Sequence, residues 1–392
     1  MDKELTWAFN FAVEKDVWFV SYWYNFLCRY DINLGTLECI QLPIKNTVEG
    51  LFNGIVKTGD TIIMIPSTAD VICLYSVIDS QFLIFPIKKM QGDKFLVYSV
   101  YKEYIYMFPN SYPYIIKFNL QNYEIEYLNF MDNEQVIQVG LQGSTYGQYA
   151  YLTQQDSNAI IIYNLENETY ERIEIGQPEE RYSSILKVQE GEVWLTNQSG
   201  EIIIYDLNSS RAEKISIQIP EFEIDSLSVV PCFLGNMEHG DFVYFFPGKA
   251  NMIIKVNKYT RQIEKAIFSD MVCQDGDNIF GWHGSLLSIP QKKDVLYIFN
   301  LESRSFFSVD LETGNVDKRE IKMDSLSDEE LKGLFEEYGS TILDEQSRGV
   351  YLEMGAEYLN LHNFIKVKVI EKSLDYKKQH NENIGEMIYQ QM

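Results

Sequence analysis

Histidine and basic residues are scarce in this chain of 392 residues, which has four histidines and 33 Lys and Arg against 57 Asp and Glu. The net charge of −24 would repel a phosphate backbone, so the composition argues against nucleic acid as a direct partner. No apolar run reaches the roughly 18 residues of a membrane-spanning helix, which argues against a membrane partner. Residues 1–16 also lack the apolar core of a signal peptide, so we expect a cytoplasmic protein.

Cysteine is also rare, and its five copies are odd in number, scattered and never paired as CxxC. This arrangement favours buried, reduced thiols over disulfides or metal ligands. Recognisable catalytic motifs are missing as well, since the chain has no HExxH, Gly-x-Ser-x-Gly or phosphate-binding loop sequence. The sequence therefore predicts no metal, no cofactor and no catalytic residue. The cysteines are Cys28, Cys39, Cys73, Cys232 and Cys273.

Apolar and aromatic residues are abundant instead. Hydrophobic residues make up 46% of the chain and aromatic residues 14%, with 27 Tyr and 23 Phe. This is enough material for a large core, and it excludes an intrinsically disordered chain. Tyrosine and phenylalanine favour strands over helices, so the composition indicates an all-β protein.

One pattern recurs seven times along the chain. In each copy a strand-like run ends in an aromatic residue or valine followed by Asp, Asn or Ser, and then a polar turn leads to another strand. We call each such pair of residues an end marker. The seven end markers are Tyr30-Asp31, Tyr75-Ser76, Phe118-Asn119, Tyr163-Asn164, Tyr205-Asp206, Val256-Asn257 and Val309-Asp310. The second residues of successive markers are 45, 43, 45, 42, 51 and 53 positions apart.

The end marker has a local physical explanation. The Asp, Asn or Ser side chain can accept hydrogen bonds from N–H groups two residues further on, which closes a turn, and the aromatic residue or valine can pack between neighbouring sheets. Upstream of most markers an acidic residue precedes four or five apolar ones, as after Asp60, Glu103 and Asp241. Apolar residues on both faces of so short a strand indicate burial on both faces.

Each unit offers about four strands, because a further strand-like piece precedes the acidic residue. Four-stranded units of roughly 45 residues that are buried on both faces are typical of the blades of a β-propeller. The sequence predicts a seven-bladed β-propeller over residues 1–323, whereas a β-sandwich would not require so regular a spacing. The pattern resembles the broad propeller superfamily that includes kelch and WD-repeat proteins. The Gly-Gly doublet of kelch repeats and the Gly-His and Trp-Asp signatures of WD40 repeats are absent, so the resemblance assigns no functional residue.

Residues 324–392 do not follow the repeat and are expected to form a short, mixed, partly helical C-terminal extension. Ser327 and Glu330 have the spacing of a helix capping box, and apolar residues at helical spacing follow, so a helix is predicted over 327–338. Two interpretations remain open for the extension: it packs on the propeller and braces the junction of the first and last blades, or it docks a partner.

The two longest marker spacings point to one candidate binding site. Insertions in a repeat array often map to loops on the binding face. The added residues around 220–240 and 270–294 contain His239 and the pair Trp282 and His283, which glycines flank. Trp282 and His283 form a possible stacking platform for a sugar or peptide. The alternative is that Trp282 belongs to the core and His283 to an inner strand.

A second candidate lies in the first unit, where Trp23 and Tyr24 occupy a hairpin turn that carries polar residues or proline in other units. Exposed aromatic residues at a turn favour recognition, although these two residues could equally pack under the C-terminal extension. Asn10, Asn53 and Ser184 fall on innermost strands, so we expect them to line the central channel.

These observations favour a non-catalytic scaffold that binds a protein or peptide partner. The alternative is a carbohydrate-binding protein or carbohydrate-active enzyme with its site at the axial mouth of the propeller. The enzyme would gather two carboxylates, or a histidine and a carboxylate, at that mouth, whereas the scaffold would present an apolar or aromatic patch.

Overall fold

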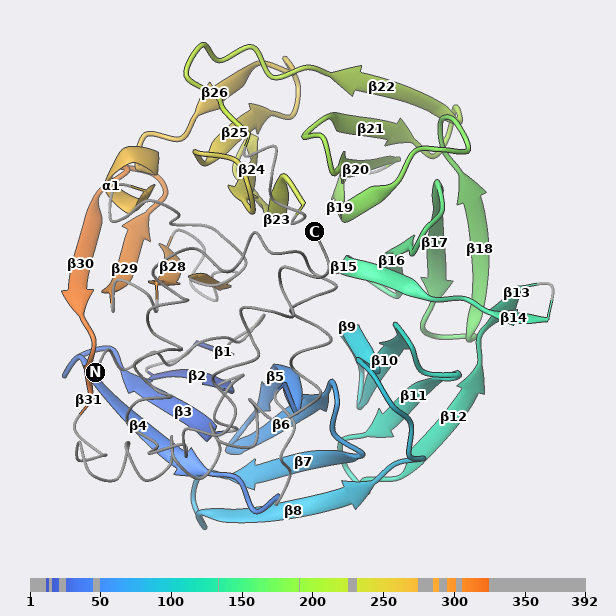
Figure 1. The fold of residues 1–392 in the computed structure, drawn as a ribbon, viewed down its shortest axis with the longest axis vertical. Coiled ribbons are helices and arrows are strands. Elements are labelled where there is room, and N and C mark those ends of the chain that lie inside the picture. The colour runs from blue at the N-terminus through green and yellow to red at the C-terminus, as the bar shows by residue number, and fades with distance from the viewer. Residues whose placement is uncertain are drawn as a thin grey trace, which may run out of the picture. The chain divides into compact units, whose positions relative to one another are not determined.

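Short antiparallel sheets arranged around a central axis make up the fold (Figure 1). The computed structural model describes residues 12–13, 16–20, 26–44, 50–132, 134–189, 191–224, 231–273, 285–288, 295–300 and 305–323. In this part of the chain six sheets have four strands and one has five, and a two-stranded hairpin, β13 (Met131–Asp132) and β14 (Gln135–Val136), stands apart. The predicted all-β, seven-bladed propeller is confirmed, and α1 (Ser269–Cys273) is the one helix among the described residues.

Each blade takes four strands from a contiguous stretch of chain, and these strands follow one another outward from the axis (Figure 1). The innermost strands are β1 (Ala12–Val13), β5 (Phe52–Thr58), β9 (Phe95–Tyr101), β15 (Val139–Tyr146), β19 (Tyr182–Gln189), β23 (Phe233–His239) and β27 (Ser285–Ser288). The second strands are β2 (Asp16–Val20), β6 (Thr61–Pro66), β10 (Tyr104–Pro109), β16 (Tyr149–Gln154), β20 (Glu192–Asn197), β24 (Phe242–Pro247) and β28 (Val295–Asn300).

The two remaining strands complete each blade toward the rim. The third strands are β3 (Phe26–Asp31), β7 (Val71–Ser76), β11 (Tyr114–Asn119), β17 (Ala159–Asn164), β21 (Ile202–Asp206), β25 (Ile254–Asn257) and β29 (Ser305–Asp310). The outer strands are β4 (Thr36–Gln41), β8 (Gln81–Pro86), β12 (Ile125–Asn129), β18 (Thr169–Glu174), β22 (Arg211–Ile215), β26 (Ile263–Lys265) and β30 (Val316–Glu320).

Every end marker occupies the last two positions of a third strand. In each blade the oxygen of the Asp, Asn or Ser side chain accepts a hydrogen bond from a backbone N–H two or three residues further on. In the fourth blade, for example, Asn164 Oδ1 accepts bonds from the N–H groups of Glu166 at 2.9 Å and Asn167 at 3.3 Å. The predicted turn chemistry is confirmed for all seven markers.

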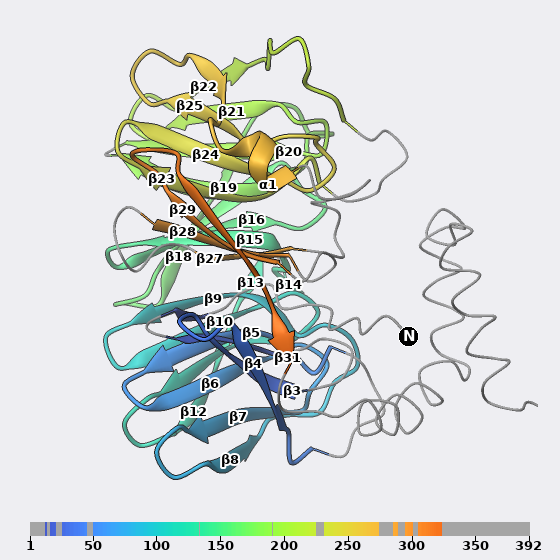
Figure 2. The same ribbon diagram turned by 90° about the vertical axis from the view of Figure 1, so that its left-hand side faces the viewer.

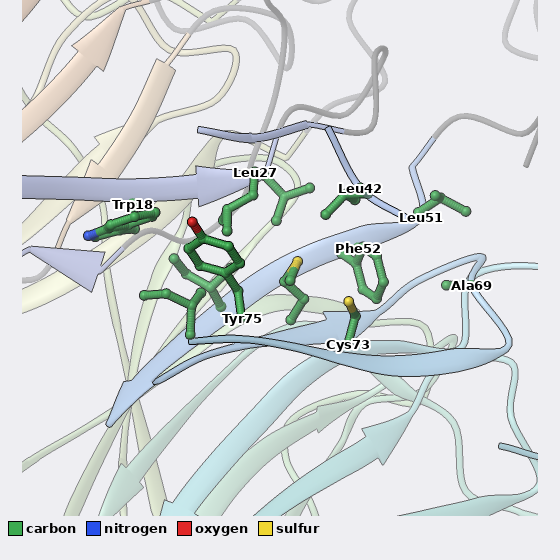
Figure 3. Packing of buried hydrophobic residues seen from close by; sticks show 12 residues of the cluster. Trp18, Leu27, Leu42, Leu51, Phe52, Ala69, Cys73 and Tyr75 are labelled. Atoms are coloured by element: carbon green, nitrogen blue, oxygen red, sulfur yellow. The ribbon is translucent and has the colours of Figure 1, made fainter. Parts of the chain in front are cut away.

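Seven apolar layers, one between each pair of neighbouring blades, form the core. The aromatic residue or valine of every end marker is buried in the layer that faces the preceding blade. Figure 3 shows the layer between the first two blades, where Trp18 and Leu27 of the first meet Phe52, Cys73 and Tyr75 of the second. Since each blade is covered on both faces by its neighbours, the second strands are apolar on both sides, as the sequence predicted. The seven layers correspond to seven separate clusters of buried residues.

The ring closes on the outer edge of the first blade. Beyond the last blade, β31 (Lys322–Met323) pairs in parallel with β4, with Lys322 opposite Thr36 and Met323 opposite Leu37 (Figure 2). The Arg319 guanidinium also donates a hydrogen bond to the carbonyl oxygen of Ile32. The first blade therefore has five strands, and the chain that follows the seventh blade supplies the fifth.

The extension predicted for residues 324–392, with its helix at 327–338, lies outside the described residues. Within the described part of the chain, no helix has the length and apolar character needed to cross a membrane.

The contribution of an end marker can be measured at Asn164. Replacing Asn164 with Ala removes an acceptor for two backbone N–H groups, so we expect the free energy of unfolding to fall by about 1–2 kcal/mol. Urea unfolding followed by tryptophan fluorescence would measure this change. Asn164→Asp keeps the acceptor oxygen and should stay close to the parent; an equal loss in both variants would contradict the role given to this oxygen.

Candidate functional site

Five of the residues predicted to bind a ligand lie outside the described part of the chain. They are Asn10, Trp23, Tyr24, Trp282 and His283. Their ligand-binding roles stay predictions.

His239 is described, and it is not in a loop insertion as the sequence indicated. It is the last residue of β23 and pairs with Phe242 across the tight turn to β24, because the added residues precede this blade and leave its strands intact. The Asp310 carboxylate lies within its electrostatic reach. Hydrogen bonds from Thr313 and then Glu312 lower the pKa of Asp310, and the charge of His239 lowers it slightly further. The ligand-binding role of His239 stays a prediction.

Asn53 lies on an innermost strand, as predicted, but its side chain is buried. It is the extra residue of a β-bulge between β5 and β6, which turns its amide toward the next blade. There Asn53 Nδ2 donates a hydrogen bond to the carbonyl oxygen of Phe95 at 2.6 Å. Its Oδ1 is buried and has no hydrogen-bond partner among the described residues. Asn53 therefore connects two blades, and its predicted contact with a ligand stays a prediction.

Ser184 is likewise part of a connection between blades. It is fully buried on β19, and its Oγ lies 2.7 Å from Thr196 Oγ1 and accepts a hydrogen bond from Asn236 Nδ2 of the next blade at 3.0 Å. A similar bond, Thr145 Oγ1 to Ser99 Oγ at 2.7 Å, joins the inner strands of the fourth and third blades. The polar residues of the inner strands thus hold neighbouring blades in register.

Carboxylates are rare on the inner strands. Their described residues include one, Glu238, and it forms an ion pair with Lys258 at 2.6 Å. Across the described part of the chain, no group of three or more His, Cys, Asp or Glu side chains is arranged to hold a metal ion.

The outer strand of the second blade, β8, has a composition unlike that of the other outer strands. Its sequence is Gln-Phe-Leu-Ile-Phe-Pro, without a charged residue, whereas each of the six other outer strands contains at least one Asp, Glu, Lys or Arg. Charged side chains on an edge strand discourage pairing with another chain. Leu83 and Ile84 at the centre of β8 are 50% and 41% exposed. The strand lies at the rim of the ring (Figure 1).

Two aromatic residues fix β8 against its neighbours. The Phe82 ring packs against Tyr75 at a centroid distance of 4.8 Å in the layer toward the first blade. The Phe85 ring packs against Tyr123 at 5.3 Å and Phe118 at 5.7 Å in the layer toward the third blade. Because side chains alternate along a strand, Leu83 and Ile84 project from opposite faces between these anchors. The result is a charge-free edge that is anchored by two aromatic residues and exposes apolar residues on both faces.

Sequence reasoning missed this edge, although the signal was present. The run from Gln81 to Ile87 is the one outer-strand segment of the repeat without a charge. The absence of charge in this run is informative only once β8 is known to be an outermost strand, where side chains do not need to be apolar for burial.

The cysteines fall into two kinds of environment. Cys73 and Cys232 are buried singly in different layers, and burial raises the pKa of each thiol to about 12. Cys28 is also buried, whereas Cys39 is partly exposed, and the two thiols face one another across β3 and β4. Cys28, Cys73 and Cys232 are buried, as the sequence predicted, whereas the partial exposure of Cys39 was not expected.

Comparisons with known proteins identify the fold without identifying a family. No family model and no curated protein sequence matches the chain. Propellers are among the solved structures that match. Virginiamycin B lyase from Staphylococcus aureus, in a catalytically inactive form with quinupristin, has a TM-score of 0.55 at 13% identity and covers 76% of this chain and 93% of its own. YCF48 bound to D1 peptide has the same TM-score and identity and covers 76% and 88%. A chain of the mitotic checkpoint complex has a TM-score of 0.50 at 10% identity and covers 81% and 87%.

These likenesses are too low in identity to carry function, so they establish the class of the molecule: it is a seven-bladed β-propeller.

The thiol environments give a testable difference in reactivity. Because a raised pKa keeps Cys73 and Cys232 protonated at pH 8, we expect iodoacetamide to label them at least about 100-fold more slowly in the folded protein than in urea. Peptide mapping by mass spectrometry at timed intervals would measure both rates. Labelling of these two thiols at similar rates in folded and unfolded protein would contradict their burial.

Proposed function

We propose that this chain is a non-catalytic propeller scaffold that binds an extended segment of a protein or peptide along the edge of β8. The observation that supports the proposal is the exposed, charge-free outer strand between the anchors Phe82 and Phe85. A cytoplasmic location goes with the proposal, since the described cysteines are thiols.

Strand addition accounts for how such an edge would bind. An edge strand presents backbone N–H and C=O groups, and an extended peptide can satisfy them as an added strand. Leu83 and Ile84 would give the contact its apolar component on the two faces of the blade. Rigid anchoring matters because an ordered edge loses little conformational entropy on binding. A net charge of −24 on the scaffold favours partner segments that are neutral or basic.

The solved neighbours are compatible with this reading at the level of fold. One is a propeller bound to a peptide and another belongs to a multiprotein complex, whereas a third is a lyase. Propellers therefore host both binding and catalysis, and the fold does not choose between them. The β8 edge favours binding. For the carbohydrate alternative, the described inner strands offer the carboxylate of Glu238, which is already paired with Lys258.

The proposal can be tested with a library of random peptides displayed on phage and selected on the immobilised full-length chain. A selected peptide, synthesised with a fluorescent label, is then titrated with each variant and followed by anisotropy. We expect Leu83→Lys and Ile84→Lys each to weaken binding by at least about tenfold, because a lysine at either position places a charge on the apolar contact. Ile267→Lys is the matched control, since Ile267 is exposed (73%) and lies on the sixth blade, away from β8; it should bind as the parent does.

Two outcomes would contradict the proposal. If Trp23→Ala or Trp282→Ala abolishes binding while the β8 variants bind normally, the binding site lies at the aromatic residues predicted from the sequence. If no peptide is enriched and an array of oligosaccharides is retained instead, the carbohydrate alternative replaces peptide binding.

A further inference from the structure

Two cysteines of the first blade occupy positions from which they could bond to one another. Cys28 on β3 and Cys39 on β4 are directly opposite in the antiparallel ladder, and their Sγ atoms are 4.0 Å apart. They are eleven positions apart in the sequence, so no CxxC spacing marks them. The strand register alone brings them together.

The backbone at this position already has the spacing of a disulfide. Opposite residues of an antiparallel pair have Cα atoms about 4.5–5.5 Å apart, and disulfides join Cα atoms about 4.4–6.8 Å apart. The two sulfurs need to approach from 4.0 Å to about 2.0 Å, which rotation of the side chains can supply without moving either strand.

The two thiols differ in their exposure to solvent, so one of them is expected to react before the other. Cys39 is partly exposed to solvent, whereas Cys28 is completely buried behind it. A small disulfide in solution can reach Cys39, and Cys28 is held where it can attack whatever forms on Cys39. Cys73 and Cys232 have no such arrangement, since Ile84 stands opposite Cys73 on β8 and Cys232 lies in a different layer.

We propose that Cys28 and Cys39 form a reversible disulfide by exchange with a low-molecular-weight disulfide such as glutathione disulfide. The Cys39 thiolate attacks one sulfur of glutathione disulfide, which breaks its S–S bond and releases one glutathione thiolate. The Cys28 sulfur then attacks Cys39 Sγ, and its proton passes to the departing glutathione sulfur, which is released as the second glutathione. Two protein thiols are oxidised and one glutathione disulfide is reduced to two glutathiones.

The cysteine pair lies where the ring closes, so a Cys28–Cys39 disulfide would act at the junction of the first and last blades. Cys28 is buried with Tyr297, Phe306 and Ile321 in the layer between the first and last blades, and Cys39 packs against that layer. Cys39 belongs to β4, the strand that β31 joins to close the ring. The disulfide would therefore fasten the strand that receives the closing segment to the next strand inward.

Trypsin provides a direct assay, because it cleaves after Lys15, Arg29 and Lys45 and so separates Cys28 from Cys39. The folded full-length chain is incubated with glutathione disulfide, the remaining thiols are blocked with iodoacetamide in urea, and the digest is analysed without reduction. We expect peptides 16–29 and 30–45 to appear as one cross-linked species and two of the five thiols to be lost. Addition of dithiothreitol should restore both thiols.

The single variants separate this mechanism from a lone reactive thiol. In Cys28→Ser we expect a glutathione adduct to accumulate on Cys39, and in Cys39→Ser we expect peptide 16–29 to stay unmodified. A parent protein that keeps all five thiols, or that stops at the adduct on Cys39, would overturn the proposal. A cross-link from Cys28 or Cys39 to any other cysteine would also overturn it.

Discussion

Burial of both faces of every blade by its neighbours is the constraint on which the structure depends. A four-stranded unit of this chain exposes an apolar surface on each side, and packing on one neighbour would cover only one of them. Closing seven units into a ring covers all fourteen faces with seven layers, each built from two consecutive blades or, at the seam, from the last and the first. The aromatic residue or valine of each end marker always faces the preceding blade. Each layer therefore receives its end-marker residue from the later of its two blades, or from the first blade at the seam.

Polar contacts then fix the geometry that apolar packing leaves open. The end markers shape the turns within each blade, and the hydrogen bonds of Asn53, Thr145 and Asn236 connect inner strands of neighbouring blades. These contacts occupy polar side chains of the inner strands that could otherwise bind a ligand in the channel. At the rim, the outer strand β8 lacks the charged residues of the other outer strands and leaves Leu83 and Ile84 exposed.

The sequence predicted the repeated parts of the fold well, because their signals are local. The Asp or Asn of an end marker acts on the next few residues. Pro66, Pro109 and Pro247 each end a second strand, because proline has no N–H to donate to a ladder. Contacts between distant segments left no comparable pattern: the pairing of β31 with β4, and of Cys28 with Cys39, depends on strand register. The candidate site was harder still. His239 proved to end a strand, and the Asn53 amide is directed at a neighbouring backbone by a bulge that residue spacing does not reveal.

Closure at the outer edge has a mechanical meaning. Among the described residues two pairs join β31 to the first blade, and they lie at its outer edge. Tension applied to the chain beyond Met323 would load the pairing of β31 with β4 before it loaded any whole blade. The seam between the first and seventh blades is therefore the part of the ring that such a pull would load first.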